Sequence, residues 1–554
     1  MNNYKVAKEL LDIKTLLELN DDPLKANQYE NAALTVLALD KPIVQFSNLN
    51  FLTTEIASDV VDMLSTGFSP KKEVLEEKTP KVLKQLAKIP GIRTKDVIEL
   101  YKKLEIDSIS DIERALKNGV IRKVFGERYE EQLRRAVFYY RGGAAELSLF
   151  YASSYANAVK MALSDIGKIE VVGSVRRGKE VVNNIDFVFS FDSEKLLKEV
   201  TASFDTKALT RKGNLITFKD FDGFTLKFYK VPEQFFSAGL QYYTGSKTHN
   251  KAIQEIAHGK GYEVSKEGFV MLAVESEEAF YKALSLQYIP PEIREGEEEI
   301  DLAANDLLPD IIDLSDIRGD LHTHTTFSDG MSSVFEMYDE ANLLDYEYIA
   351  ITDHSKQLKI ARGLSNLTLQ KEIDVIDRIN SSSLSPRILK GIEAEIGFNG
   401  TVDVDSNFIN KLDFVIGGLH QFSQTRFENT ERVRKAIESG IIDIVAHPTD
   451  RVIFLRNSIE VDINKIFEVA SREKVALEIN LFPNRMDLST GLIKEARRSG
   501  VKYFSVGTDA HSRGHLNFMK YGVKLLKRAW VKKEEILNTY SIEELKDLLW
   551  TRVH

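Results

Sequence analysis

Histidines and acidic residues gather at the ends of short apolar segments in the second half of this 554-residue chain. The stretch "DLHTHTTFSDG" holds His322 and His324 two residues apart with Asp329 just beyond, and "GTDAHS" holds Asp509 and His511 at the same spacing. Side chains two residues apart in an extended strand point to the same face. A lone histidine is more often a structural residue than a ligand, but the repetition of this pattern favours a metal site.

Four further segments end in the same way, and "ITDHS", "KGIEAEI", "GGLHQ" and "VAHPTD" contribute His354, Glu393, His420 and His447. Imidazole nitrogens together with carboxylates suit Mn²⁺, Zn²⁺ or Fe²⁺, and a bridging glutamate can hold two or three such ions. Ions bound in this way lower the pKa of a coordinated water and polarise a phosphoryl oxygen. These residue types therefore predict hydrolysis of a phosphoester.

Apolar strands separated by helical stretches must position these ligands. The strands expected from residue 317 onward are "RGDLHTH", "YEYIAITDH", "RILKGIEAE", "LDFVIGGLH", "IIDIVAH", "VALEIN" and "YFSVGTDAH". Strands that alternate with helices predict a parallel β/α barrel, and such barrels place their active sites at the carboxyl ends of the strands. The candidate ligands stand at those ends.

Residues 318 to about 535 resemble a PHP (polymerase and histidinol phosphatase) domain, a (β/α)7 barrel with a trinuclear metal site. The nine ligand positions of that family match His322, His324, Asp329, His354, Glu393, His420, His447, Asp509 and His511. The resemblance implies that Glu393 bridges ions and that a hydroxide held by the ions is the nucleophile. It further implies one ion at His322, His324 and Asp509, a second at Asp329, His354 and His511, and a third at His420 and His447.

A second stretch with possible chemistry, "GSVRRGKEVVNNIDFVFSF", begins at Gly173. Its glycine–serine turn can cradle phosphates with backbone N–H groups, helped by an arginine. The later stretch "YYTGSKTHN" has the composition of a second nucleotide-contacting turn. The candidate nucleotide-binding residues are Gly173, Ser174, Arg177, Tyr242, Thr244, Gly245, Ser246 and Asn250. The alternative is that the glycines serve backbone conformation alone.

These two stretches resemble a family X DNA polymerase, and with the PHP domain they resemble the bacterial and archaeal two-domain form over nearly the whole chain. That family has metal-binding acids where this chain has Asn184, Asp186 and, by a gapless count, Lys227. A two-metal mechanism needs anionic ligands for its Mg²⁺ or Mn²⁺ ions. We therefore expect a catalytically silent or very weak palm, unless a shifted strand register brings in Asp222.

The first 142 residues read as helical, and "LAKIPGIRTKDVIELYKKL" has the pattern of a helix-hairpin-helix. Its turn, Pro90, Gly91, Ile92 and Arg93, would offer backbone N–H groups to a DNA phosphate. Residues 69–142 carry 18 Lys and Arg against 12 Asp and Glu, although the whole chain has a net charge of −10. Local DNA binding is one interpretation, and a plain αα-hairpin with a solvated surface is the other.

Length and composition indicate a multidomain α/β protein. The expected parts are a helical domain (1–75), helix-hairpin-helix fingers (76–145), a nucleotidyltransferase palm (146–232), a thumb (233–295), a linker (296–316) and the PHP barrel (317–554). The absence of cysteine fits a reducing cytoplasm. We expect no membrane span, because no apolar run approaches about 20 residues, and no signal peptide, because the first residues have the pattern of an amphipathic helix. A monomer is the default expectation.

The leading hypothesis is a DNA repair enzyme that hydrolyses DNA from 3′ to 5′ at the PHP site. Its partners would be gapped or nicked DNA or 3′ ends. The first alternative is an active gap-filling polymerase that binds dNTP and uses the PHP domain for editing. The others are a non-catalytic DNA-binding scaffold and a hydrolase of small phosphomonoesters.

Overall fold

The computed structural model describes residues 1–549, apart from 90–91, 142–145, 221–222, 383–384 and 424. The chain forms two compact units. The first contains Met1–Tyr288 and Glu295–Ile300, and the second contains Ile289–Arg294 and Asp301–His554. The chain therefore passes between the units at three places within a dozen residues.

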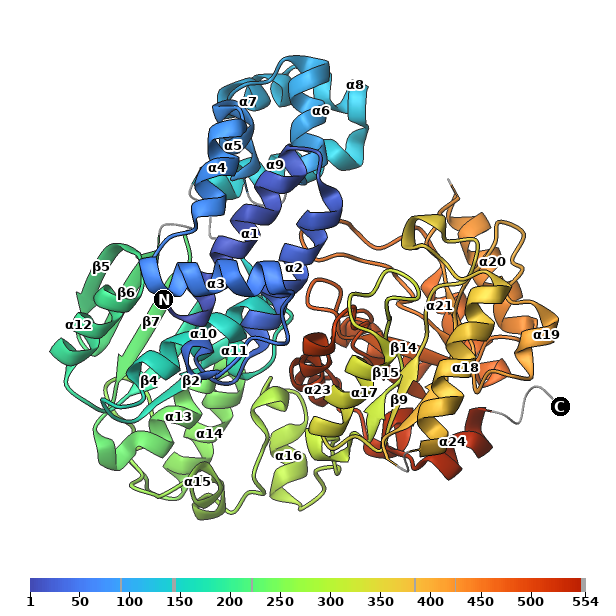
Figure 1. Ribbon diagram of the computed structural model, residues 1–554. Helices are drawn as coiled ribbons and strands as arrows, with labels where there is room; N and C mark the ends of the chain where they lie inside the picture. The colour runs from blue at the N-terminus through green and yellow to red at the C-terminus, as the bar shows by residue number, and fades with distance from the viewer. Residues whose placement is uncertain (90–91, 142–145, 221–222, 383–384, 424, 550–554) are drawn as a thin grey trace. The chain divides into compact units, whose positions relative to one another are not determined.

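Helices make up the first part of the first unit (Figure 1). They are α1 (Asn3–Leu19), α2 (Pro23–Ala38), α3 (Thr54–Thr66), α4 (Pro70–Lys78), α5 (Lys81–Ala87), α6 (Thr94–Leu104), α7 (Ile109–Lys117), α8 (Val120–Phe125) and α9 (Glu127–Tyr140). Side chains such as Asn2, Thr53 and Ser69 cap helix starts by accepting backbone N–H groups. Leucine, isoleucine and valine side chains of α5–α9 form one buried cluster. The expected helical character of this part is confirmed.

A five-stranded sheet follows in the order β2-β4-β7-β6-β5. Its strands are β2 (Ile169–Val172), β4 (Asn184–Phe189), β5 (Thr206–Lys212), β6 (Leu215–Asp220) and β7 (Thr225–Lys230). Phe187 of β4 stacks on Phe228 of β7, with ring centroids 4.8 Å apart. This part also contains a two-stranded sheet of β1 (Leu147–Ser148) and β3 (Val181–Val182). Its helices are α10 (Leu149–Leu163), α11 (Gly173–Arg176), α12 (Ser193–Ser203), α13 (Phe236–Thr244), α14 (Lys247–Gly259) and α15 (Glu277–Ala283).

The second unit is built on parallel strands. They are β8 (Gly319–Asp320), β9 (Tyr348–Ile351), β10 (Arg387–Lys390), β11 (Glu393–Glu395), β12 (Ile416–Gly418), β13 (Ile444–Val445), β14 (Ala476–Asn480) and β15 (Phe504–Gly507). They pair in the orders β10-β9-β8 and β11-β12-β13-β14-β15. Single parallel bridges, Thr323 with Ala510 and His354 with Glu393, connect these two sheets. Each expected strand segment contains at least one of these strands.

Helices alternate with those strands, including α17 (Val334–Leu343), α18 (Asn366–Ser382), α20 (Arg426–Glu438), α21 (Ile463–Glu473), α22 (Thr490–Arg498) and α23 (Met519–Arg528). The strand side chains are almost all buried, as expected for parallel strands covered on both faces. None of the helices in the described part of the chain is both long and apolar enough to cross a membrane.

The acidic segment expected to be a linker, residues 296–316, is partly folded. It contains α16 (Glu299–Ala304) and the 3₁₀ helix η4 (Leu314–Asp316). The side chain of Glu299 is fully buried and accepts a hydrogen bond from His249 Nδ1 at 2.8 Å within the first unit. Ile312 is fully buried in the second unit. An acidic composition therefore concealed one of the buried contacts of the first unit.

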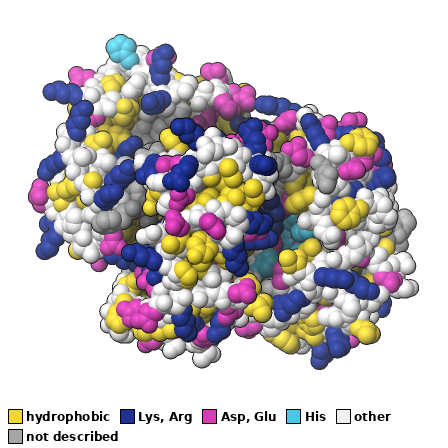
Figure 2. All heavy atoms as spheres, turned by 90° about the horizontal axis from the view of Figure 1, so that it is seen from above, with side chains coloured by type: hydrophobic (Ala, Val, Ile, Leu, Met, Phe, Trp, Pro, Cys, Tyr) yellow, Lys and Arg dark blue, Asp and Glu magenta, His cyan; other side chains and the backbone are white. Residues whose placement is uncertain are grey.

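Acidic and basic side chains are interspersed on the face of the molecule shown in Figure 2, without a uniform basic coat. Several arginines in α6–α9 or directly beside these helices lie in local ion pairs. Arg93 contacts Asp96 at 2.8 Å, and Arg141 contacts Glu113 at 2.9 Å. Of the predicted DNA-binding turn, Pro90 and Gly91 lie outside the described residues, Ile92 is half-buried and Arg93 is exposed.

Candidate metal centre

The nine ligand candidates of the second unit come together at the carboxyl ends of its strands. His324, Asp329, His354 and His511 form one group whose ligand atoms lie within 4.8 Å of one another. The other groups that meet the same distance are His322, His324 and Asp509, and His354, Glu393 and His420. His447 completes the set, because its Nε2 lies 2.9 Å from Glu393 Oε1.

Glu393 occupies the middle of the cluster and is 1% exposed. Its Oε1 faces His420 Nε2 at 3.2 Å as well as His447, and its Oε2 faces His354 Nδ1 at 2.9 Å. His322 Nε2 lies 3.4 Å from the same Oε2. A carboxylate with imidazoles on both oxygens has the geometry of a bridging ligand.

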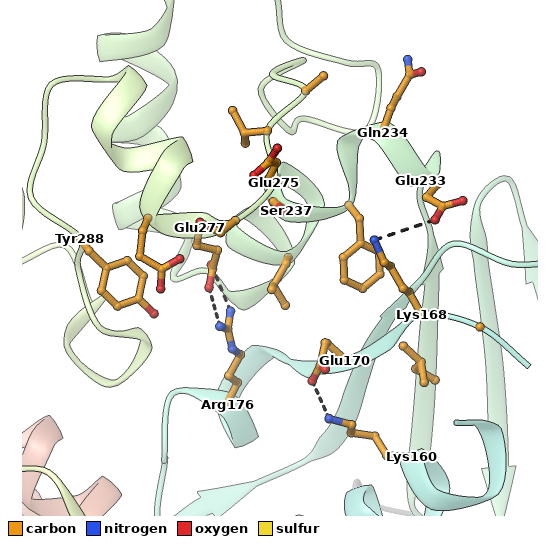
Figure 3. Close-up of a pocket in the computed structure, with 18 of the residues that line it drawn as sticks. Lys160, Lys168, Glu170, Arg176, Glu233, Gln234, Ser237, Glu275, Glu277 and Tyr288 are labelled. Carbon is orange, nitrogen blue, oxygen red and sulfur yellow. Dashed lines mark hydrogen bonds and ion pairs between the residues drawn. The ribbon is translucent and has the colours of Figure 1, made fainter. Parts of the chain in front are cut away.

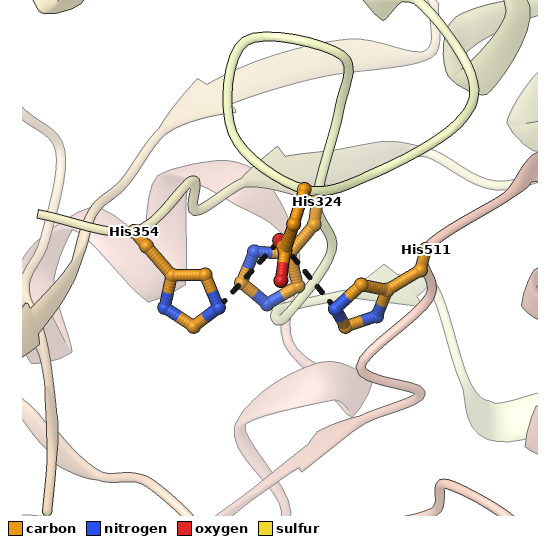
Figure 4. Close-up of side chains that lie close together, drawn as sticks. His324, His354 and His511 are labelled. Atoms are coloured by element: carbon orange, nitrogen blue, oxygen red, sulfur yellow. Dashed lines mark ion pairs between the residues drawn. The ribbon is translucent and has the colours of Figure 1, made fainter. Parts of the chain in front are cut away.

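A second part of the cluster surrounds Asp329, where three histidine rings face one another (Figure 4). His354 Nε2 and His511 Nε2 lie 3.7 Å and 3.6 Å from Asp329 Oδ1. The His324 ring stacks on the His354 ring, with centroids 4.4 Å apart. These imidazoles and this carboxylate come from three segments that follow β8, β9 and β15.

The donor atoms fit divalent cations. His322 Nε2 and His324 Nε2 face each other at 3.1 Å. If both nitrogens carry a proton, or neither does, they repel each other; a hydrogen bond forms only when one donates and the other accepts. His324 Nδ1 and His447 Nδ1 are buried and find no hydrogen-bond partner among the described residues. Buried polar nitrogens without partners are costly, whereas a shared cation would satisfy several of them.

The electrostatics of the cluster favour ionised carboxylates, which are the form that binds cations. Burial opposes ionisation of Glu393 and Asp509, yet the neighbouring imidazoles hold the pKa of both carboxyls well below the usual range. Burial likewise opposes protonation of His420, but Glu393 and Glu395 raise its pKa to about 10. The pKa of His324 is lowered by burial and by His354 and His511. Cation binding would displace the proton from a histidine whose pKa is raised, such as His420.

Acidic side chains outside the nine hold the ligands in place. Glu478 Oε1 lies 2.6 Å from His322 Nδ1, and its Oε2 accepts the backbone N–H of His447 at 2.6 Å. Glu395 Oε2 lies 2.8 Å from His420 Nδ1. Such contacts fix the tautomer and orientation of a metal-binding histidine. The sequence analysis missed both acids, although Glu478 stands alone inside the apolar strand "VALEIN" and Glu395 lies two residues from Glu393.

The grouping of the ligands differs in detail from the one that the family resemblance implies. The group at His322, His324 and Asp509 is the expected one, but His324 also lies in the group of Asp329. His354 also joins Glu393 and His420 in a group, while His420 and His447 both face Glu393 Oε1.

In the first unit, Asn184 and Lys227, which are predicted to stand where a polymerase palm carries acids, both lie next to Asp186. Asn184 Nδ2 donates a hydrogen bond to Asp186 Oδ2 at 2.6 Å. Lys227 is the strand partner of Asp186 in the parallel pairing of β4 with β7. Burial raises the pKa of Asp186 to about 6, although Lys227 and Asn184 oppose the shift. Asp222, the alternative acid, lies outside the described residues.

The two predicted nucleotide-contacting stretches meet at the junction of α11 with α13. Arg177 Nη1 donates to the carbonyl of Thr244, and its Nε lies 3.0 Å from Glu295 Oε1. Asn250 Nδ2 donates to the carbonyl of Tyr242 at 2.6 Å. These polar groups therefore have internal partners.

The two glycines of these stretches have a conformational reason to be glycine. Gly173 has a φ of +67°, and a Cβ at that position would collide with the carboxylate of Asp186. Gly245 has a φ of +75° and faces Arg177. Positive φ values are strained for other residues. Ser174 is half-buried, and Ser246 caps α14 by accepting the N–H of His249 at 3.2 Å.

A separate cavity of about 1170 Å³ lies in the first unit and is lined by residues of α10, β2, α13 and α15 (Figure 3). Its basic side chains are paired with acids, since Arg176 contacts Glu277 at 2.5 Å and Lys160 contacts Glu170 at 2.7 Å. The cavity therefore lacks the surplus positive charge of a phosphate site. Asp186 does not line it.

Two known families match the chain, one largely within the first unit and one within the second. The DNA polymerase beta thumb family matches residues 239–295, and the PHP domain family matches residues 320–481. PHP domains are metal-dependent, in agreement with the clusters described above. Probable phosphatases of Shewanella loihica and Acetivibrio thermocellus are each 29% identical, over 42% of this chain and 94% of their own length.

One relative matches from end to end. The DNA polymerase/3′-5′ exonuclease PolX of Bacillus subtilis is 31% identical over 575 aligned residues, which cover 99% of both chains. The alignment spans both units, so the polymerase-like unit and the metal-binding unit occur together in this relative as well. The chain belongs to the family X DNA polymerases that carry a C-terminal PHP domain.

Proposed function

We propose that this protein hydrolyses DNA phosphodiesters from 3′ to 5′ at the metal centre of the second unit. The observation that carries the proposal is the convergence of nine histidine and carboxylate side chains around Glu393. The Bacillus subtilis relative, whose name includes a 3′-5′ exonuclease, supports the polarity. The strands would close as a (β/α)7 barrel, which the bridge between Thr323 and Ala510 supports.

The chain's own residues would hold and orient the reacting groups. Divalent ions, with Mn²⁺ or Zn²⁺ as the best fit, would lower the pKa of a water and polarise a phosphoryl oxygen. Glu393 would bridge the ions, and Glu478 would keep His322 in the tautomer that leaves Nε2 free. Asn480, which donates to Asp509 Oδ2 at 3.2 Å, would orient that carboxylate.

The palm would bind DNA ends without adding nucleotides. Asp186 is the single acid at the expected positions among the described residues, with an amide on one side and an ammonium on the other. A site with one carboxylate of raised pKa is a poor ligand for two Mg²⁺ ions. The same proposal includes DNA binding by the fingers around residues 90–93 and the domain boundaries predicted from the sequence.

An active polymerase is the second candidate. Two observations favour it: the name of the Bacillus subtilis relative, and the meeting of both nucleotide-contacting stretches at Arg177 and Thr244. Templated nucleotide addition that vanishes in Asp186→Ala would establish it.

A third candidate is a phosphomonoesterase, because the relatives that cover the second unit alone are named probable phosphatases. Faster release of phosphate from p-nitrophenyl phosphate than of nucleotides from DNA would favour it.

One gel tests the first two candidates together. It follows a 5′-labelled gapped duplex with Mn²⁺ or Mg²⁺, with and without dNTP, for wild type, His324→Ala and the exposed-histidine control His258→Ala. We expect shortening in wild type and control, none in His324→Ala, and lengthening in none of them. Shortening that persists in His324→Ala would refute the proposal.

A further inference from the structure

Large apolar side chains are exposed on the second unit. Several of them lie in segments that follow β9, β11 and β12, the strands whose ends carry His354, Glu393 and His420. They are Ile360, Leu367, Phe398, Phe422 and Phe427. Parallel strands end at a common edge, so these segments surround the same mouth. Phe398 is 64% exposed and Phe422 is 37% exposed.

The Phe398 ring packs against a buried cation. The guanidinium carbon of Arg432 lies 4.5 Å from the centroid of the Phe398 ring. Arg432, with 2% of its side chain exposed, donates to the carbonyls of Ile396 at 2.5 Å and Gln421 at 2.6 Å. The arginine thereby fixes the loop after β11 to the loop after β12 and leaves the ring with an open face.

Phe398 and Phe422 are connected to the metal ligands by short contacts. Glu395 lies 3.9 Å from Arg432 on one side and 2.8 Å from His420 on the other. Phe422 stands two residues beyond His420, and the guanidinium of Arg456 lies 5.6 Å from its ring. Arg456 in turn contacts Asp450, three residues after His447, at 2.6 Å.

We propose that Phe398 and Phe422 form a base-stacking rim that holds unpaired nucleotides of the DNA strand whose phosphate enters the metal centre. This proposal rests on the proposed function of that centre. Exposed rings that arginines hold in place offer a stacking face, which suits a strand of unpaired bases. The two residues are specificity-determining and contact bases, whereas Arg432 positions Phe398.

Unpaired bases suit this rim better than a protein partner. The rings adjoin a cluster that would hold cations and a phosphate, and a DNA strand supplies the phosphate and the bases together. Paired bases are stacked within the duplex, so their faces are not available to a side chain.

The test compares substrates with and without bases. Steady-state rates would be measured on a single-stranded oligonucleotide and on a version whose last three sugars lack bases, for wild type, Phe398→Leu, Phe422→Leu and Phe398→Trp. Leu343→Ala is the matched control, because Leu343 is 77% exposed at the end of α17, away from the carboxyl ends of the strands.

We expect the leucine variants to raise KM for the normal oligonucleotide about 10-fold, in the range of one stacked base. Their kcat should stay within about twofold, and neither variant should change KM for the baseless substrate. Phe398→Trp should behave as wild type, since it keeps an aromatic face. Equal losses on both substrates, or no loss on either, would overturn the proposal.

A binding measurement separates the rim from the chemistry. In EDTA, an oligonucleotide with 2-aminopurine at its 3′ end should lose fluorescence on binding wild type and Leu343→Ala, and much less on binding Phe398→Leu. Absence of hydrolysis in wild type with this quenching intact would refute the proposed function and leave the rim standing. Equal quenching in Phe398→Leu would refute the rim.

Discussion

At the scale of single residues, the palm and the metal centre use the same side-chain types in opposite ways. Around Glu393, imidazoles keep the pKa of a buried carboxyl low, which suits a ligand for cations. Around Asp186, burial dominates and raises the pKa of the carboxyl to about 6. The carboxylate of the palm is therefore poorly prepared to bind metal, whereas that of the second unit is well prepared.

The raised pKa of Asp186 predicts a pH-dependent stability. The folded state holds the proton more tightly than the unfolded chain, so the free energy of unfolding should fall as pH rises from about 4 to about 6 and stay lower above. Asp186→Asn has no charge to bury and should be more stable at pH 8 by on the order of 2 kcal/mol, with no gain near pH 3.5. Urea unfolding at the two pH values measures this, with exposed Asp165→Asn as control. A gain of equal size at both pH values would contradict the assignment.

The replaced acids predict a gain of function. Asn184→Asp combined with Lys227→Asp would put three carboxylates on β4 and β7, where wild type has one. We expect the double variant to add nucleotides to a gapped primer with Mg²⁺ at a rate at least about 100-fold above wild type, because charge neutralisation is a large part of phosphoryl transfer. Primer extension measures it, with Asn183→Asp, which changes an exposed neighbour, as control. Equal extension by wild type would show that the palm never lost activity.

At the scale of elements, strands carry the ligands and their neighbours fix them. Glu478 of β14 contacts both His322, which follows β8, and the backbone of His447, which follows β13. One side chain thus sets the spacing of ligands from two other strands.

Removal of that charge predicts weaker metal binding with little change in fold. Glu478→Gln keeps the size of the side chain but lowers the basicity it gives to His322, so metal affinity should fall about 10–100-fold. Calorimetric titration of the metal-free protein with Mn²⁺ measures this, and exposed Glu468→Gln is the control. Unchanged affinity in Glu478→Gln would mean that the tautomer of His322 does not limit binding.

The sequence was most informative where one chemical need repeats. Strand-end histidines identified the cluster because each ligand must reach the same edge of the parallel strands. Strand β5 gives no such signal in the sequence, because "TKALTRK" is polar and largely exposed and lacks hydrophobic alternation. The buried position of Glu299 was also hidden, since its partner His249 is 50 residues away in the chain. The exposed ring of Phe398 on Arg432 depends on two loops that only the fold brings together.

At the scale of the whole molecule, the two units exchange short segments. Residues 289–294 belong to the second unit, where Ile289 and Arg294 are fully buried and η3 (Pro291–Ile293) contacts α23. Residues 295–300 belong to the first unit, where Glu295 contacts Arg177 and Glu299 contacts His249.

This exchange predicts how fragments behave. A fragment 289–554 keeps η3 in contact with α23, and we expect it to bind metal and to unfold cooperatively. A fragment 301–554 lacks the buried side chains of Ile289 and Ile293. Loss of two buried isoleucines alone should cost the shorter fragment on the order of 4 kcal/mol. Thermal unfolding of both fragments with Mn²⁺ measures the difference, and equal midpoints would contradict it.

The crossing of the chain between its units also bears on inheritance. A recombination event that joined a polymerase gene to a PHP gene at one clean boundary would have left each product without a few residues that its present interior contains. On the proposal that the palm is silent, point changes at Asn184 and Lys227 would end its activity and keep residues 289–300 intact, whereas deletion of the first unit would remove the partners of residues 295–300.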